Sequence, residues 1–143
     1  MEDTILIARR FVNEVWNDGN PDAVEDYVDP HCRLCDSLTS KVVFGADKLK
    51  DYVRACRNAF PDLNVTIRHA FREGKEVVVH WTAQGTQDGT FFGISPSHKK
   101  ASVCGVAILK FEGDKIVEQW ADRGLHSVLA NLWRLETRAG APH

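Results

Sequence analysis

The sequence predicts an α+β fold in which three helices pack on a curved, mainly antiparallel sheet. Apolar residues recur at helical spacing up to Phe60, whereas from Leu63 to Arg123 they alternate as in strands separated by short turns. Helices and strands that are segregated along a chain are typical of α+β proteins rather than of doubly wound parallel sheets. We therefore expect an α+β fold with the helices on the concave face of a curved sheet, an arrangement that gives a cone-shaped cavity.

The first two predicted helices lie close to the N-terminus. Asp3 or Thr4 is a suitable N-cap for the first helix, and residues 17–20, Asn-Asp-Gly-Asn, end it. Pro21 suits the first position of a short second helix, which closes at Asp29-Pro30. The apolar positions of the first helix share one face: Ile7, Ala8, Phe11, Val12, Val15 and Trp16.

The third predicted helix runs from about Ala46 to Phe60 and is followed by the strands. The segment before Gly45 reads as irregular. Two turns, residues 72–75 and 112–115, join strand-like runs in pairs. The predicted strands cover residues 64–71, 76–84, 101–111 and 115–123, and a closing helix follows from Leu125 to Trp133.

Length and charge limit the classes of protein that this chain can represent. The 143 residues suit a single domain, 1–143, with a core over 4–133 and a frayed tail over 134–143. The 18 basic and 20 acidic side chains are mixed, which gives no basic stripe for nucleic acid and no polybasic cluster for a membrane surface. No apolar run approaches a membrane span, and the start, Met1-Glu2-Asp3, lacks a signal-peptide pattern. We expect a cytoplasmic protein without nucleic-acid or membrane partners.

Cys32 and Cys35 form a CxxC motif that could suggest a zinc or redox site. A structural zinc site needs a second pair of ligands, and no second CxxC, CxxH or HxxxH follows. Cys56 lies on the apolar stripe of a predicted helix and Cys104 lies in a predicted strand, so both read as core residues. We expect no metal.

Several segments, in their order along the chain, resemble the SnoaL-like polyketide cyclases of the nuclear-transport-factor-2-like superfamily. They are FVNEVWNDGNPDAVEDYV, AFPDLNVTI, GTQDGTFFGISPSHKK with its spaced Gly85, Gly89, Gly93 and Pro96, and DKIVEQW. The resemblance covers about residues 4–133. It implies a cone-shaped α+β barrel, usually a homodimer, with a hydrophobic pocket inside the cone. It also implies chemistry without metal or cofactor on polycyclic, enolisable substrates: aldol ring closure, hydroxylation or isomerisation.

The chain departs from these cyclases at both acid–base positions. The family places an aspartate four residues after the position of Trp120, where this chain has Gly124, and a histidine where it has Gln87. Gln87 can donate a hydrogen bond to a carbonyl oxygen but cannot carry a proton at neutral pH. Asp122 lies two residues before Gly124, so in an extended strand it points to the same side as Trp120.

Asp122 is therefore the candidate acid–base group. Desolvation among Trp81, Phe91 and Trp120 would raise the pKa of its carboxyl toward the range that suits proton transfer. His126, four residues later, could form a dyad with it. Alternatively, Asp122 pairs with Arg123 or caps the last helix, and His126 lies on an exposed flank.

The remaining site candidates are substrate-binding residues. If Gln87 lines the pocket, strand parity places Trp81 beside it and turns His80 to the other face. Asp36 either binds a substrate hydroxyl at the mouth or is a solvated loop residue. The predicted substrate-binding set is Asp36, Trp81, Gln87, Phe91 and Trp120.

The expected function is cofactor-independent acid–base catalysis on a polycyclic or other hydrophobic metabolite, by cyclisation, isomerisation or hydroxylation. A non-enzymatic protein that binds a hydrophobic ligand is the main alternative, and a dehydratase or epoxide hydrolase is a further one. Residues 101–111 are apolar at both parities, so both faces of that strand should be covered. A second subunit is the expected cover of the face that the helices leave bare.

Overall fold

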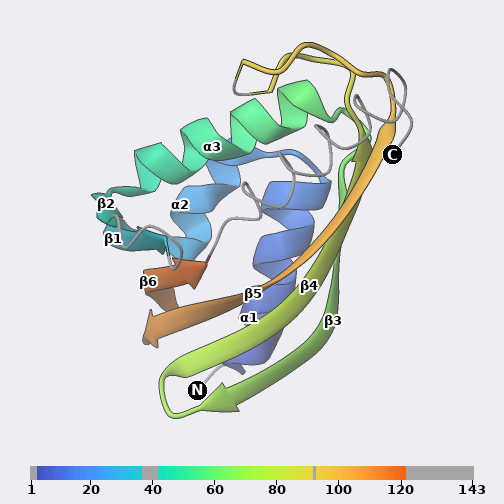
Figure 1. The fold of residues 1–143 in the computed structure, drawn as a ribbon. Helices are drawn as coiled ribbons and strands as arrows, with labels where there is room; N and C mark the ends of the chain where they lie inside the picture. Colours follow the sequence, from blue (N-terminus) through green and yellow to red (C-terminus); the bar gives the residue numbers. More distant parts are fainter. Residues whose placement is uncertain (1–2, 37–41, 92, 122–143) are drawn as a thin grey trace.

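The structure, a computed structural model, describes residues 3–36, 42–91 and 93–121. Helices lie on one face of a curved six-stranded sheet (Figure 1). The helical elements are α1 (Thr4–Phe11), the π-helix η1 (Val12–Asn17), the 3₁₀-helix η2 (Pro21–Ala23), α2 (Val24–Tyr27) and α3 (Ala46–Ala59). The strands are β1 (Val28–Asp36), β2 (Val42–Phe44), β3 (Asn64–Glu73), β4 (Glu76–Thr86), β5 (Lys100–Glu112) and β6 (Lys115–Ala121). The α+β prediction is confirmed.

The sheet has the strand order β2-β1-β6-β5-β4-β3. Every neighbouring pair is antiparallel except β1 and β6, which are parallel. Both predicted hairpins form, with Gly74 (φ 59°) and Gly113 (φ 62°) at the first turn position, where two-residue hairpins require a positive φ. The long antiparallel strands β3, β4 and β5 give the sheet its curvature along one side of the molecule (Figure 1).

The strand β1 was not predicted. The sequence suggested that a helix closes at Asp29-Pro30 and that an irregular segment follows, but residues 28–36 form a strand. Its pairing with β6 is long-range, for example between Leu34 and Gln119, and no local pattern reports it. The register shifts between Val28 and Arg33, which accommodates Pro30 because a proline cannot donate a ladder hydrogen bond.

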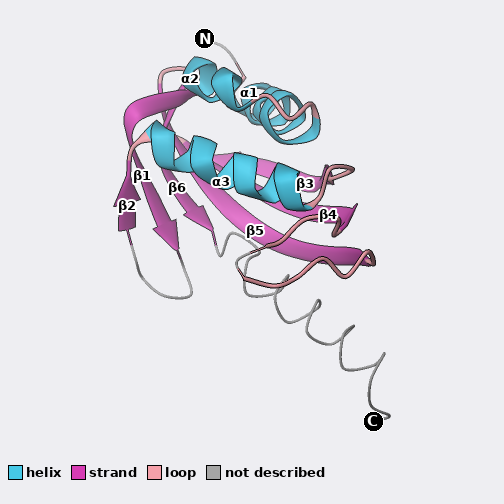
Figure 2. Ribbon diagram, turned by 90° about the horizontal axis from the view of Figure 1, so that it is seen from above, coloured by secondary structure: helices cyan, strands magenta, loops and turns pink. Residues whose placement is uncertain are grey.

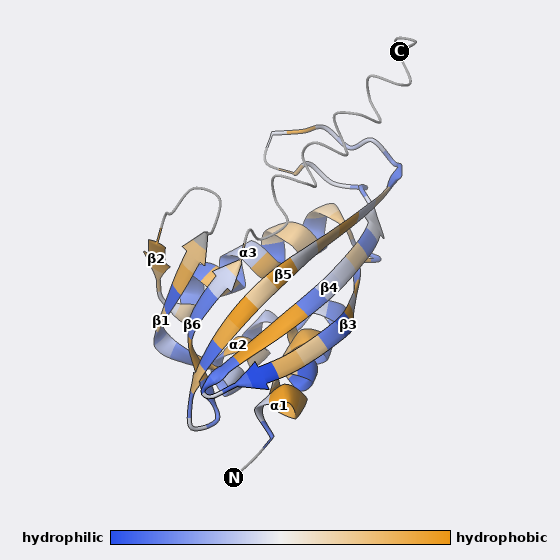
Figure 3. Cartoon of the chain, turned by 60° about the horizontal axis from the view of Figure 1, so that its bottom comes forward, coloured by the Kyte–Doolittle hydropathy of each residue, from blue (hydrophilic) through white to orange (hydrophobic). Residues whose placement is uncertain are grey.

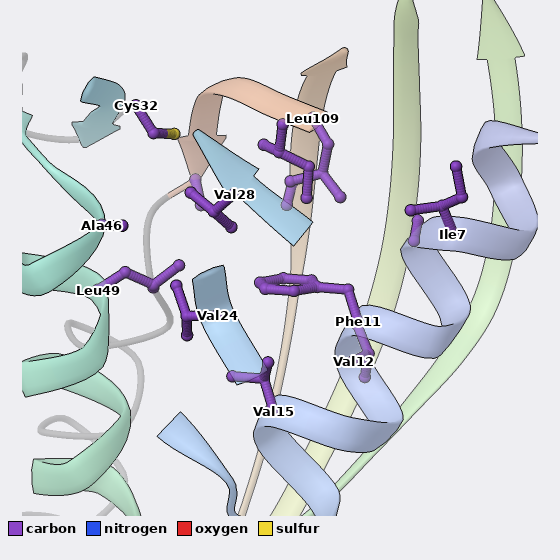
Figure 4. Packing of buried hydrophobic residues seen from close by; sticks show 14 of the residues in the cluster. Ile7, Phe11, Val12, Val15, Val24, Val28, Cys32, Ala46, Leu49 and Leu109 are labelled. Atoms are coloured by element: carbon purple, nitrogen blue, oxygen red, sulfur yellow. The ribbon is translucent and has the colours of Figure 1, made fainter. Parts of the chain in front are cut away.

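The core lies between the helices and the inner face of the sheet. Phe11, Val15, Val24 and Leu49 converge from the helical side toward Leu109 of β5 (Figure 4). The predicted apolar face of the first helix is buried, since Ile7, Ala8, Phe11, Val12 and Val15 are all inaccessible or nearly so. Figure 2 shows α1, α2 and α3 on the same side of the sheet, which leaves the opposite face without a covering element among the described residues.

Asn17 fastens the helical layer to the edge of the sheet. Its side-chain oxygen accepts from the backbone N–H of Val65 at 2.6 Å, and its amide donates to the carbonyl of Val65 at 2.9 Å. An edge strand presents unpaired backbone groups of this kind. Asn17 satisfies one pair of them on β3, which fixes the N-terminal helices against the sheet.

The predicted closing helix from Leu125 lies outside the described residues. Of the helices that are described, none has both the length and the apolar character needed to cross a membrane.

Candidate functional site

A cavity lies between the helices and the inner face of the sheet. Its wall is almost entirely apolar, with side chains from every layer: Phe11, Val12, Trp16, Leu49, Tyr52, Val79, Trp81, Ala83, Phe91, Ala107 and Leu109. The cavity offers about 150 Å³ to the centre of a water-sized sphere. An apolar cavity of about 150 Å³ holds a benzene ring in another protein. The enclosed part of this site therefore has room for about one ring.

Lys48, Gln84 and Gln119 are the long polar side chains that border this cavity. Lys48 and Gln84 are exposed, whereas Gln119 has a shielded oxygen. Gln119 lies on β6 between Leu34 of β1 and Leu109 of β5, in the middle of the sheet. Its Oε1 is shielded from solvent and has no hydrogen-bond partner among the described residues. A buried acceptor without a partner costs roughly 1–3 kcal/mol, so such groups are rare in native structures. A hydrogen bond from a donor on a bound ligand would relieve this cost.

Trp81 and Phe91 line the cavity, whereas Gln87 does not. Phe91 is buried and packs edge-on against Phe60, with ring centroids 5.3 Å apart. Trp81 and Ala83 both face the cavity, and His80 lies on the other face of β4, as strand parity requires. That Trp81 and Phe91 bind a substrate stays a prediction.

The placement of Gln87 in the pocket wall is wrong. Gln87 is fully buried, and its amide donates to the carbonyls of Gly89 (3.2 Å) and Ile94 (3.1 Å). Its Oε1 accepts from the backbone N–H of Ser97 at 3.2 Å. Strand β4 ends at Thr86, so parity no longer applies at the next residue. Gln87 uses both amide hydrogens to hold the loop that connects β4 to β5.

The placement of Trp120 in the pocket is also wrong. Trp120 is 40% exposed, and its indole N–H donates to Glu118 at 2.9 Å on the outer face of the sheet. The prediction placed Trp120 inside because it shares the parity of Gly124, the position of the family's aspartate. In β6 an extra residue, between the pair Phe111–Ile116 and the pair Lys110–Glu118, puts Trp120 on the face opposite the buried Ile116. Gln119 lines the cavity instead.

Asp122 and His126 lie outside the described residues. Strand parity placed Asp122 on the inner face together with Trp120. Because Trp120 lies on the outer face, parity no longer supports an inner position for Asp122. Asp36 ends β1, where its backbone pairs with Ala121. Its side chain is also outside what the structure describes.

The buried thiols near the cavity are poor nucleophiles. Burial raises the pKa of Cys56, in the cavity wall, to about 12. Burial and then the charge of Asp29 raise the pKa of Cys32 to about 12 as well. Both are protonated at neutral pH, and the reactive form of a cysteine is the thiolate. All four cysteines are described, and none forms a disulfide. Across residues 3–36, 42–91 and 93–121, no three His, Cys, Asp or Glu side chains gather as metal ligands would.

Comparison with known proteins assigns this chain to a family. A family model described as SnoaL-like polyketide cyclase matches residues 6–132. No match to the chain is found among curated proteins.

Solved structures with the same fold are similar over most of the chain. A protein from Jannaschia sp. CCS1, provisionally described as a SnoaL-like polyketide cyclase, has a TM-score of 0.81 at 23% identity, over 97% of this chain and 93% of that one. AclR from Streptomyces galilaeus, provisionally described as a hydroxylase, has a TM-score of 0.74 at 24% identity, over 82% and 76%. IdmH from Streptomyces antibioticus, provisionally described as a polyketide cyclase, has a TM-score of 0.74 at 18% identity, over 92% and 99%.

Proposed function

Because this chain belongs to the SnoaL-like polyketide cyclase family, we propose that it binds a small hydrophobic metabolite in the inner cavity. The observation that carries the proposal is an apolar wall whose described part contains the shielded amide oxygen of Gln119, without a partner among the described residues. Ligand sites in proteins combine mostly apolar walls with a few placed polar groups that orient the ligand. The cavity and Gln119 fit that description.

The wall also restricts the ligand. One ring fills the enclosed space, and further rings of a larger metabolite would extend toward the mouth. The Oε1 of Gln119 is an acceptor, so the buried end of the ligand carries a hydroxyl or an N–H group. Burial of an unpaired carboxylate against these apolar residues would be costly, which favours a neutral group at that end.

A pair of probes of similar shape tests the role of Gln119. Phenol and toluene differ mainly in the hydroxyl donor, and Gln119→Leu removes the acceptor while the wall stays covered. We expect the variant to weaken phenol binding relative to toluene by about 2- to 12-fold, since one hydrogen bond contributes roughly 0.5–1.5 kcal/mol. NMR titration of both probes against both proteins gives the ratio. An unchanged ratio would show that Gln119 does not recognise a donor.

Cofactor-independent proton transfer on that ligand is the second candidate function. The cyclase and hydroxylase names of structural neighbours favour it. No carboxylate or imidazole belongs to the described part of the cavity wall, so this function requires Asp122, with or without His126. Gln119, rather than Gln87, would then hold the substrate, with its Oε1 accepting from the enol hydroxyl that forms when the proton leaves the carbon. Cyclisation, isomerisation and hydroxylation all begin from an enolisable group.

Hydrogen–deuterium exchange at the α-carbon of 1-tetralone distinguishes a protein that catalyses proton transfer from one that only binds a ligand. If Asp122 abstracts a proton, the native protein accelerates the exchange, and Asp122→Asn abolishes the acceleration while phenol still binds. Asn keeps the shape of the side chain but cannot accept a proton. If the native protein gives only the buffer rate, the non-enzymatic alternative is the better account.

We also propose that a second copy of the chain covers the outer face of the sheet. On this face Phe71 of β3 is 58% exposed and Val106 of β5 is 52% exposed. Trp120 lies on β6, the neighbour of β5 in the sheet. In Figure 3 the helices lie behind the sheet, and the middle of β4 and of β5 is hydrophobic. Sedimentation of the native protein should give a dimer, and Val106→Glu should give a monomer. A native protein that stays monomeric at micromolar concentration would exclude this contact.

A further inference from the structure

Lys48 is the one charged side chain among the described residues that line the cavity. It is exposed to solvent, so it lies where the cavity opens. Helix α3 brings it there, because Lys48, Tyr52 and Cys56 follow one another at intervals of four residues along the helix face that borders the cavity. A mostly apolar stripe therefore ends in a cation at the first turn of the helix.

The ammonium group of Lys48 makes no ion pair or hydrogen bond within the described part of the chain. The nearest acids of the same helix face other cations: Asp47 lies 3.9 Å from the ammonium of Lys50, and Asp51 lies 3.3 Å from the guanidinium of Arg54. Lysine side chains lay their aliphatic stem on apolar surface and keep the ammonium in water. Lys48 therefore carries a positive charge that no described acid neutralises, at the rim of an apolar cavity.

Lys48 lies on the same side of the cavity as the row of residues that leads to Gln119. Val43 of β2, Leu34 of β1 and Gln119 of β6 lie side by side in register, and all three line the cavity. Neighbouring strands are about 4.8 Å apart, so Gln119 is about 10 Å from Val43. The chain passes from β2 directly into α3 (Figure 2), and the backbone N–H of Lys48 donates to the carbonyl of Gly45 at 3.2 Å. A ligand that reaches Gln119 can thus extend past Val43 toward Lys48.

We propose that Lys48 selects ligands that carry one carboxylate at their solvent-exposed end. The inference rests on the proposed ligand site and adds the second end of the ligand: a neutral hydroxyl or N–H group meets Gln119, and a carboxylate meets Lys48. One ammonium matches a single negative charge, whereas a phosphate group carries close to two. The ligand class is therefore a hydrophobic monocarboxylic acid with a ring between its two polar ends.

The position of Lys48 at the rim keeps the cost of the ligand's charge low. A carboxylate there stays in contact with water, whereas beside Gln119 it would be desolvated. An exposed ion pair is correspondingly modest in strength and is weakened by salt. Burial of the apolar part supplies most of the affinity. Lys48 therefore acts mainly in the choice between ligands of similar shape.

Two probes, p-hydroxyphenylpropanoate and its neutral primary amide, test the proposal, because they differ in charge at one end only. We expect Lys48→Met to weaken binding of the acid relative to the amide by about two- to fivefold, as for a solvent-exposed ion pair. Lys48→Arg should keep the native ratio. Lys75→Met is the matched control, because Lys75 is an exposed lysine at the β3–β4 turn, outside the cavity wall, and its loss changes the net charge equally.

The outcomes separate this inference from the proposed function. If both probes bind and their ratio is the same in the native protein and in Lys48→Met, the role of Lys48 is overturned and the cavity function stands. An equal change in Lys75→Met would show attraction by net charge alone and would also overturn it. If the native protein binds neither probe, the cavity function and this inference fail together.

Salt gives a second measurement of the same contact. The preference of the native protein for the acid should fall at about 1 M sodium chloride, since salt screens exposed charges. The ratio of phenol to toluene binding, which depends on neutral groups, should not change. A preference for the acid that is independent of salt would contradict an ion pair at the rim.

Discussion

Two glutamines, Gln87 in the β4–β5 loop and Gln119 in the cavity wall, differ in how their shielded polar atoms are satisfied. Gln87 makes hydrogen bonds through both its amide nitrogen and its oxygen, all to the backbone of its own loop. The oxygen of Gln119 is shielded and has no partner in the part of the chain that the structure describes, in a wall of mostly apolar side chains. Both residues look alike in the sequence, yet the first stabilises the fold and the second leaves a hydrogen bond for a ligand.

The difference shows how a binding residue can be recognised without a bound ligand. A polar side chain that the protein satisfies completely has no capacity left for a substrate. One that the protein buries and leaves unsatisfied carries a free-energy cost that a ligand can relieve. The loop and the wall should therefore respond oppositely to substitution.

The largest effect is expected in the loop, at Phe91. Phe91→Ala removes a buried ring that packs on Phe60 and also borders the cavity. We expect the free energy of unfolding to fall by about 3–5 kcal/mol, which is typical of a phenylalanine deleted from a core. Urea denaturation measures it. A loss below about 1 kcal/mol would mean that the loop contributes little to stability, and the contrast with the wall would fail.

Gln87→Leu should have the next largest effect. The change leaves the carbonyls of Gly89 and Ile94 and the N–H of Ser97 without their side-chain partner. We expect a loss of about 1–3 kcal/mol in the free energy of unfolding. Gln84→Leu, at an exposed position of the preceding strand, is the control and should change stability much less. Equal effects of the two substitutions would show that the hydrogen bonds of Gln87 are not what matters.

Gln119→Leu should act in the opposite direction. It replaces an unpaired buried acceptor with an apolar group, so the free energy of unfolding should stay the same or rise by up to about 1 kcal/mol. The measurement is the same urea titration, in the absence of ligand. Destabilisation by an amount similar to that of Gln87→Leu would mean that Gln119 is satisfied within the fold, and the proposed ligand contact would lose its basis.

The smallest effect concerns pH and Asp62, which holds the end of β4 next to Gln87. The backbone N–H (2.6 Å) and then the hydroxyl (2.9 Å) of Thr86 donate to this carboxylate and lower its pKa. Its stabilising contribution is therefore complete above the unfolded pKa of about 4 and is lost as the pH falls through the lowered native pKa. The difference in unfolding free energy between native protein and Asp62→Asn should shrink below about pH 4. A difference that stays constant down to about pH 2 would contradict this.

Local patterns predicted the elements that depend on local interactions. The helix Ala46–Ala59 has its apolar stripe within one segment, and the hairpin around Gly74 has its turn residue between the two strands that it joins. The strand Val28–Asp36 was missed because its long partner, β6, is distant in the sequence. Family and fold could thus be predicted from the sequence, but not the full strand order.

The site was predicted less well than the fold, and the reason is alternation. Strand parity placed Trp81 correctly because β4 is regular from Trp81, which pairs with Ile67, to the end of the strand. It failed for Trp120 because the position of Gly124 was taken to face the cavity, whereas Trp120 lies on the outer face. It failed for Gln87 because the strand had already ended. The alternation of apolar and polar residues reveals neither a bulge nor the end of a strand. The sequence therefore did not identify Gln119 as a residue of the cavity wall.

The parallel pairing of β1 with β6 has a consequence for the order in which the chain folds. On its other side β1 has only the three-residue β2, and it precedes β6 by most of the length of the protein. The hairpins β3–β4 and β5–β6 close over short loops and form early, whereas β1 must wait until β6 is present. During synthesis, the last described strand therefore completes the sheet, and the first strand to leave the ribosome is among the last to find its place. Pulsed hydrogen exchange during refolding should accordingly show late protection of the amides of β1.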